Sequence, residues 1–145
     1  MSPADRPGAA SVDIWERLLR FQRHAVREMD EHLQARFGQP LDAYDVLHQV
    51  ARHGAPLRMG DLAERLLVAH SSCNRIVGRL VDSGHLTRRP GEIDRREVLV
   101  DLTPAGRALH RRMAAVHTRD IRRLVEATLT PEARLALDTN LPPLE

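Results

Sequence analysis

The chain has 145 residues, a length that supplies one hydrophobic core but not two independent folds. Its 22 basic and 20 acidic residues nearly balance at a net charge of +2, so any nucleic-acid surface must come from local clustering of arginine. No apolar run approaches the ~20 residues of a membrane span, and no signal-peptide core is found. These observations predict a cytoplasmic protein with no membrane partner. The single cysteine, Cys73, excludes an intrachain disulfide.

The N-terminal part of the chain changes character at Ser11. Residues 1–10 are too polar and too often broken by proline and glycine to fold, and are predicted to be a disordered leader. From Ser11, apolar residues three or four positions apart predict a long amphipathic helix that ends near Phe37–Gly38. They are Ile14, Leu18, Phe21, Ala25, Met29 and Leu33. Residues 11–145 are predicted to form one domain.

A second helix is expected after the loop Gln39–Leu41, with Asp42 as its N-cap. Its apolar positions are Tyr44, Val46, Leu47 and Val50. The stretch His53–Pro56 ends this helix, because it contains Gly and Pro. Arg58–Met59 is then expected to be a short strand.

Two short helices joined by a tight turn are predicted next. Gly60 is the expected N-cap of the first, which covers residues 61–67. Ser71 or Ser72 is expected to cap the second, and Gly84 supplies a left-handed stop. The buried stripe of the second helix is Ile76, Val77, Leu80 and Val81, and its outward positions are Ser72, Asn74, Arg75, Gly78 and Arg79.

This arrangement is typical of a helix-turn-helix, whose second helix enters the major groove of DNA. Small residues on that helix allow close approach, and Arg and Asn can form bidentate bonds with base edges. The residues predicted to serve the major groove are Ser71, Ser72, Asn74, Arg75 and Arg79.

A charged hairpin follows, with strands predicted at residues 86–89 and 97–102 and a break at Pro90–Gly91. Its tip carries Asp94, Arg95 and Arg96. A carboxylate beside two guanidinium groups can hold one arginine in a fixed pose while the other reaches a phosphate or the minor groove.

Residues 94–106, with the sequence DRREVLVDLTPAG, closely resemble the wing signature of MarR-type (multiple-antibiotic-resistance regulator) winged-helix proteins. That signature is D-x-R, a valine-rich strand and L-T-x-x-G. Residues 62–66 and 74–84 also resemble the two reading helices of the family, so that the resemblance covers roughly residues 11–137. Two positions depart from the pattern: Gly60 replaces the usual Ser or Thr, and His85 interrupts the usual Gly-Leu.

The resemblance implies a mainly α fold with a small β wing. A winged helix-turn-helix region, residues 42–103, would be flanked by dimerisation helices at residues 11–38 and 104–145. In the C-terminal part, Thr103 and Thr130 are each followed by proline and are expected to cap helices, the first of which reaches about Ala127. Long apolar helices at both ends of a small domain either pack within the chain or interlock in a homodimer, and the resemblance favours the homodimer.

The sequence shows no catalytic motif, so no enzyme activity, catalytic residue or cofactor is expected. None of the eight histidines has metal-ligand spacing, and no metal site is expected. His110 and His117 are interpreted as solvated residues on a helix face. Cys73 lies inside the second reading helix, where a structural thiol is favoured over one whose oxidation blocks DNA binding.

Members of the resembled family commonly bind small anionic aromatic compounds in a cleft between the dimer helices and the reading domain. The residues on segments that could line such a cleft are Trp15, Phe21, Tyr44, Asp45, His48 and Arg75. For Trp15, a place in the core of a dimer is the favoured alternative.

The sequence therefore predicts a homodimeric, sequence-specific regulator of transcription. It would repress from a palindromic double-stranded DNA operator and be released by a small-molecule effector or a stress signal, with Arg95 and Arg96 serving the minor groove or phosphates and Asp94 orienting them. Two alternatives remain open. One is a winged-helix module that binds an acidic protein through the same surface, and the other is a ligand-binding protein without DNA activity.

Overall fold

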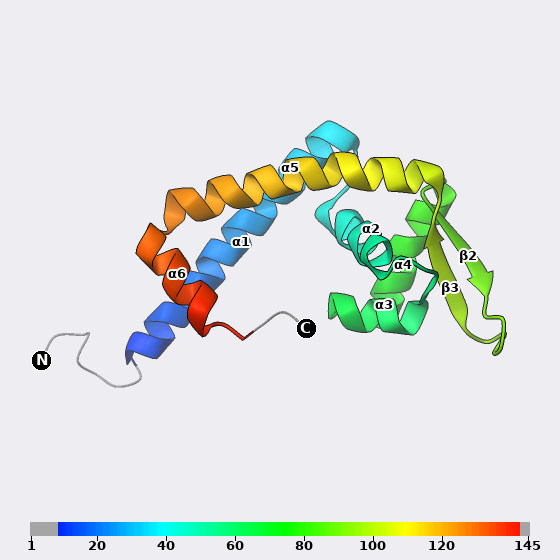
Figure 1. Ribbon diagram of the computed structural model, residues 1–145, viewed down its shortest axis with the longest axis horizontal. Helices are drawn as coiled ribbons and strands as arrows, with labels where there is room; N and C mark the ends of the chain where they lie inside the picture. Colours follow the sequence, from blue (N-terminus) through cyan, green and yellow to red (C-terminus); the bar gives the residue numbers. More distant parts are fainter. Residues whose placement is uncertain (1–8, 143–145) are drawn as a thin grey trace, which may run out of the picture. The chain divides into compact units, whose positions relative to one another are not determined.

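The structure is a computed structural model that describes residues 9–142. Figure 1 shows the helices and strands in chain order, and the chain contacts divide them into two compact units. Within the described residues, the first unit comprises residues 9–29 and 118–142, and the second is Asp30–His117. Two long helices, α1 (Ala9–Phe37) and α5 (Pro104–Thr128), each contribute to both units. Residues 1–8 of the predicted leader lie outside the described residues, and α1 begins two residues earlier than the sequence indicated.

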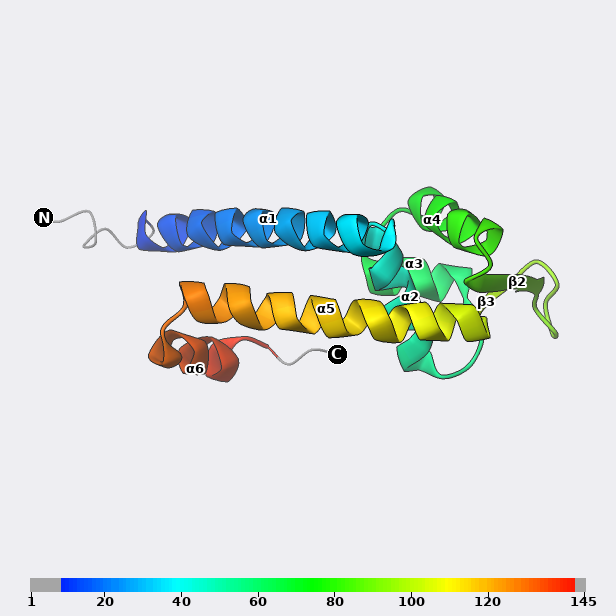
Figure 2. The same cartoon turned by 90° about the horizontal axis from the view of Figure 1, so that it is seen from above.

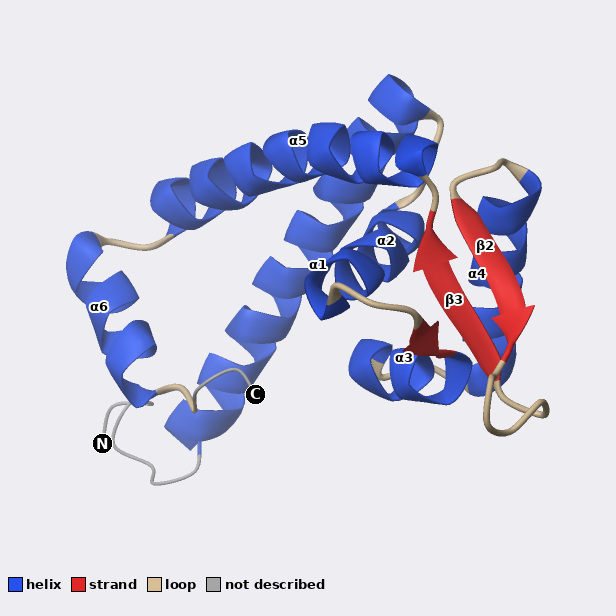
Figure 3. Cartoon of the chain, turned by 45° about the vertical axis from the view of Figure 1, so that its right-hand side comes forward, coloured by secondary structure: helices blue, strands red, loops and turns tan. Residues whose placement is uncertain are grey.

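The second unit contains the predicted helix-turn-helix and wing. Its helices are α2 (Leu41–His53), α3 (Met59–Leu66) and α4 (His70–Asp82), and its strands are β1 (Leu57–Arg58), β2 (Leu86–Pro90) and β3 (Val98–Leu102). Figure 3 shows the strands in red, as an antiparallel sheet in the order β1-β3-β2. Leu86 faces Leu102 and Pro90 faces Val98 across the hairpin. The predicted mainly α fold with a small β wing is confirmed.

Three of the predicted helix caps are wrong. The residues that precede α2, α3 and α4 are Pro40, Arg58 and Ala69, all extended and none forming a side-chain cap bond. The residues expected as caps, Asp42, Gly60, Ser71 and Ser72, lie inside the first turns instead.

Contacts from elsewhere in the chain explain these starts. Asp30 Oδ1 accepts a hydrogen bond of 2.7 Å from the backbone N–H of Leu41, so α1 supplies the cap of α2. Arg58 pairs with Leu99 in the sheet and must stay extended, so α3 begins at the next residue. The chain leaves α3 through Leu67, whose φ of 55° is left-handed, and this tight turn brings it into α4 at His70.

The wing ends on a well-defined junction with α5. The hydroxyl of Thr103 accepts a hydrogen bond from the N–H of Gly106 at 3.0 Å, which confirms the predicted cap. The same hydroxyl donates to the carbonyl oxygen of Gly84 at 2.7 Å, and the N–H of Thr103 donates to the carbonyl oxygen of His85 at 3.1 Å. The turn after α4, where Gly84 has a left-handed φ of 79° as predicted, is thereby fastened to the first turn of α5.

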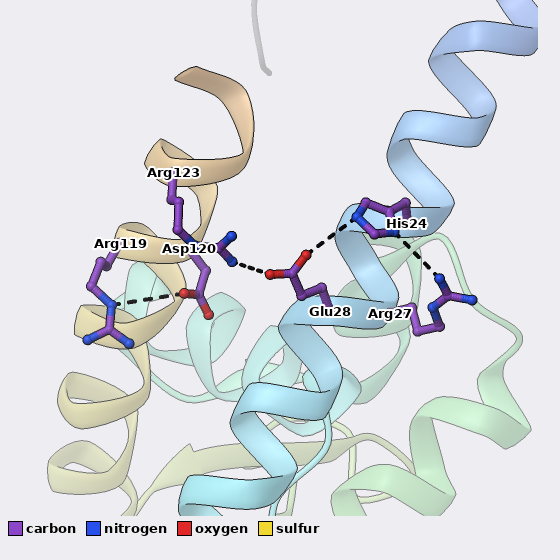
Figure 4. Close-up of polar contacts among 6 residues, drawn as sticks. All are labelled: His24, Arg27, Glu28, Arg119, Asp120 and Arg123. Atoms are coloured by element: carbon purple, nitrogen blue, oxygen red, sulfur yellow. Dashed lines mark hydrogen bonds and ion pairs between the residues drawn. The ribbon is translucent and has the colours of Figure 1, made fainter. Parts of the chain in front are cut away.

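In the first unit, α5 is followed by α6 (Pro131–Asn140), as Figure 2 shows. Thr130 caps α6 as predicted. Glu28 of α1 forms an ion pair with Arg123 of α5 and lies 3.4 Å from the His24 imidazole (Figure 4). The neighbouring Asp120 is buried. The Glu28–Arg123 ion pair connects α1 with α5 within this unit. Among residues 9–142, no helix has both the length and the apolarity needed to cross a membrane.

Candidate nucleic-acid interface

Helix α4 presents one face to solvent and one to the core. Cys73, Val77 and Leu80 are almost fully buried. The side chains predicted to serve the major groove are Ser71, Ser72, Asn74, Arg75 and Arg79, and all are exposed except the half-buried Ser72. The buried stripe therefore fixes which side chains the helix displays.

The exposed arginines of α4 differ in what holds them. Arg79 donates to Asp42 Oδ2 of α2 at 3.4 Å, whereas no ion pair of Arg75 is found in the described part of the chain. An exposed pair of this kind contributes at most about 1 kcal/mol. A phosphate or a base edge can therefore compete with Asp42 for Arg79.

Arg88 of β2 connects the wing to α4, a contact that sequence reasoning missed. Its guanidinium donates to the backbone carbonyl oxygen of Asn74 at 3.2 Å. The same group lies 3.5 Å from where a Cβ on Gly78 would stand. This distance is an ordinary van der Waals contact, so the Arg88 hydrogen bond does not require glycine at position 78. No other local signal for the contact between β2 and α4 is found in the sequence.

The wing tip is built on Asp94, but not in the way the sequence suggested. Asp94 Oδ1 accepts a hydrogen bond of 3.0 Å from the backbone N–H of Arg96. The expectation that this carboxylate holds a guanidinium is wrong, because a short Asp side chain reaches the backbone two residues ahead more readily than a flexible arginine head. Asp94 therefore shapes the loop rather than an arginine side chain.

The guanidinium groups of Arg95 and Arg96 are exposed, and neither takes part in an ion pair within residues 9–142. Two other arginines of the sheet are paired with carboxylates. Arg89 pairs with Glu92 at 3.1 Å, and Arg58 of β1 pairs with Glu97 at 3.4 Å. The tip therefore carries two arginines without an ion pair in the described chain, and Arg88, bound to a neutral backbone carbonyl, is a third in the wing.

The residues predicted to line a ligand cleft belong to two different units. Trp15 and Phe21 belong to the first unit, where Trp15 is exposed and Phe21 lines a groove. Tyr44, Asp45, His48 and Arg75 belong to the second unit. A pocket of about 290 Å³ lies in that unit beside α4, and Arg79 lines it, but none of those four residues does.

Tyr44 is the centre of an aromatic cluster between α2 and α5. Its ring stacks on His48 and His110, with centroids 5.5 and 5.9 Å apart, and lies 4.4 Å from the ring of His117. Nδ1 of His48 and Nε2 of His110 are 3.1 Å apart, a hydrogen bond. The interpretation of His110 and His117 as solvated is therefore wrong: they lie two turns apart on one face of α5, and Tyr44 packs against that face.

Burial sets the protonation of this cluster. It lowers the pKa of His48, and the positive charge of Arg52 lowers it further. Burial also lowers the pKa of His110, with the neighbouring His48 and Arg111 as further causes. The pKa of Tyr44 is raised, mainly by burial and further by the negative charge of Asp45. No three His, Cys, Asp or Glu residues in the described chain are grouped to hold a metal ion.

Asp45 makes the stability of the fold depend on pH in the opposite direction to His48 and His110. Although its surface is exposed, its neighbours desolvate the carboxyl group, and this effect together with the carboxylate of Asp42 raises the pKa of Asp45 to about 6. The folded state therefore binds a proton here more tightly than the unfolded state, so acidification through pH 6 stabilises the fold at Asp45. At the two histidines, acidification through the ordinary imidazole value of 6.5 destabilises it.

We expect Asp45→Asn to be more stable than the parent at about pH 7.5, and to lose more stability on acidification to about pH 5.5. The gain comes from removing a disfavoured charge, and the loss from His48 and His110, which no longer have an opposing group. Urea midpoints at the two pH values measure both. Adding His48→Gln and His110→Gln should remove most of the acid loss, whereas adding His70→Gln, at an exposed position, should not. If the variant with His48→Gln and His110→Gln lost as much stability on acidification as the variant with His70→Gln, this assignment would be wrong.

Cys73 is buried, and its thiol lies 3.7 Å from the sulfur of Met59. Burial raises the pKa of the Cys73 thiol. Since the thiolate is the reactive form, these observations favour the structural interpretation of Cys73 over a redox role.

Comparison with known proteins agrees with this geometry. A sequence model described as "MarR family" matches residues 37–97, which include α2 to α4 and most of the wing. AbsC, a MarR family transcriptional regulator from Streptomyces coelicolor, superposes with a TM-score of 0.82 at 27% identity over 95% of this chain and 93% of AbsC. This chain is similar to MarR family regulators in both sequence and fold.

Another MarR family regulator from S. coelicolor, Sco3205, has been solved in complex with DNA. It superposes with a TM-score of 0.81 at 28% identity, over 93% of this chain and 87% of Sco3205. An uncharacterized helix-turn-helix-type transcriptional regulator of Bacillus cereus is 32% identical over 95 residues, 66% of this chain. The match spans 61% of that relative's length.

Proposed function

We propose that this chain is a MarR family, sequence-specific DNA-binding regulator of transcription. The observation that carries the proposal is the exposed surface of the second unit. Asn74 and Arg75 of α4 are exposed there, and neither Arg75 nor the two tip arginines have an ion-pair partner in the described residues. Arginine and asparagine on a helix suit base edges, and unpaired guanidinium groups on a wing suit phosphates or the minor groove. The structure of Sco3205 with DNA supports the same use of this fold.

We infer that the regulator acts as a homodimer assembled through its first unit. A groove of about 1110 Å³ in that unit is lined mainly by apolar side chains of α1, α5, α6 and the residues beside them, together with Arg17, Arg134 and Asp138. Leu135 and Leu141 of this groove and Trp15 of α1 are each at least 60% exposed. Apolar surface of this extent is costly to leave in water, and a second copy of the same helices would cover it symmetrically. Trp15 is then part of the dimer core rather than a ligand contact.

The remaining parts of the proposal concern regulation. The dimer represses from a palindromic operator in the cytoplasm, because two symmetric α4 helices match two inverted half-sites. A small ligand of the anionic aromatic class, or a stress signal, releases it. The family resemblance of the sequence supports this release.

A selection from random duplexes, followed by footprinting, tests the proposal. We expect two inverted half-sites about one helical turn, roughly 10 bp, apart. Affinity should fall steeply with salt, by about 0.9 in the logarithm per phosphate contact for each tenfold increase. Sedimentation of the free protein should give the dimer mass. Occupation of a single half-site by a monomer would contradict the dimer, and binding that hardly responds to salt would favour the protein-interaction alternative.

A further inference from the structure

One apolar side chain stands at the wing tip. Ile93 is 102% exposed, the highest value among the large apolar side chains of the described chain. It precedes Asp94 in the loop between β2 and β3, and the charged tip arginines follow two and three residues later. Isolated exposed aliphatic residues are common on proteins, so the position of Ile93 matters more than its exposure.

The loop that carries Ile93 is closed by hydrogen bonds. The N–H of Gly91 donates to the carbonyl oxygen of Glu97 at 2.8 Å, and the N–H of Glu97 donates to that of Asp94 at 3.1 Å. The Asp94 carboxylate holds the N–H of Arg96 at 3.0 Å. A Cβ added to Gly91 would lie 2.4 Å from the Asp94 carbonyl oxygen, so the chain crosses itself closely at this point. The tip is thus ordered before any partner binds.

The chemistry of the tip is an apolar side chain beside two unmatched positive charges. Isoleucine is β-branched and has few rotamers, so it loses little entropy when it is packed. Arg95 and Arg96 would draw the tip toward a polyanion, but Ile93 gains nothing from phosphates. It gains from the apolar deoxyribose walls and base edges that line the minor groove between two rows of phosphates.

We propose that Ile93 enters the minor groove beside the bases read by α4 and favours steps without the 2-amino group of guanine. This inference rests on the proposed DNA-binding function and adds a specificity-determining residue to it. The arginines bind the phosphate rims or the groove electrostatically, whereas Ile93 senses the floor of the groove by contact. A guanine amino group on that floor stands where the side chain would pack.

The test uses the selected operator with its wing-facing flanks made of G·C pairs or of inosine·C pairs. The two duplexes present the same major groove and differ only by the guanine amino group in the minor groove. We expect the parent to bind the inosine duplex about fivefold more tightly. Ile93→Ala should bind that duplex about fivefold more weakly than the parent and should no longer distinguish the two.

Leu67→Ala is the matched control, because Leu67 is 93% exposed in the α3–α4 turn, outside the wing. It should keep the parent's preference for inosine. Equal binding of both duplexes by the parent, or an unchanged preference in Ile93→Ala, would overturn the inference and leave the DNA-binding function intact. Failure of the parent to select or bind any duplex would instead overturn the proposed function, and this inference with it.

Discussion

Gly106→Ala is expected to lower the free energy of unfolding by more than about 3 kcal/mol, or to prevent folding. A Cβ at this position would lie 1.9 Å from the backbone oxygen of His85 and 2.9 Å from its carbonyl carbon. Neither group can move alone, because the same oxygen accepts the N–H of Thr103 and the neighbouring Gly84 oxygen accepts its hydroxyl. Room for the methyl group requires α5 to separate from the turn after α4. Urea denaturation followed by circular dichroism measures the loss.

Gly60→Ala is the control for this substitution. Gly60 lies in the first turn of α3, and a Cβ there would meet nothing within 4 Å. Alanine loses less backbone entropy than glycine in a helix, so the change should be neutral or stabilise by up to about 1 kcal/mol. If Gly106→Ala proved as stable as Gly60→Ala, the close approach of α5 to His85 would be wrong.

Replacing Arg95 and Arg96 together by alanine is expected to lower the affinity for operator about 100-fold at moderate salt. The double variant removes two positive charges from each wing of the proposed dimer, and each lost phosphate contact should flatten the salt slope by about 0.9. Operator and scrambled duplexes should weaken by similar factors, because a contact to phosphate or groove width carries little information about sequence. Salt titrations on both duplexes supply the measurement.

Two further single variants serve as controls for the Arg95/Arg96 double variant. Arg89→Ala removes another wing arginine, but one that Glu92 already neutralises at 3.1 Å, so it should cost much less affinity. Arg75→Ala, on the exposed face of α4, should cost about 1–3 kcal/mol at one base position per half-site and spare non-specific binding. If the Arg95/Arg96 variant bound both duplexes as the parent does, the wing would serve only the fold.

Features whose causes lie within a few residues were predictable from the sequence. Thr103 and Thr130 cap their helices because a hydroxyl beside proline reaches an N–H three residues ahead. Gly84 ends α4 because the left-handed region favours glycine. The exposed positions of α4 follow from helical periodicity, because Cys73, Ile76, Val77 and Leu80 must face the core.

Features that depend on distant contacts were not predictable in the same way. The cap of α2 comes from Asp30, 11 residues before Leu41, so the local candidate Asp42 was misleading. His48 and His110 are 62 residues apart and meet only because α2 packs on α5. Asp94 had two plausible partners, an arginine head and a backbone N–H, and sequence alone cannot rank them.

The hydrogen bond from Arg88 to the Asn74 carbonyl has a consequence for the DNA as well as for the protein. Since β2 and α4 are fastened together, the interval between the bases facing α4 and the steps facing the wing is set by the protein. One base pair inserted between them would shift the two contacts by about 3.4 Å and rotate them by about 35° about the duplex axis. A protein that holds its two contacts at a fixed distance should tolerate a base substitution in its site more readily than an insertion or deletion that changes the spacing.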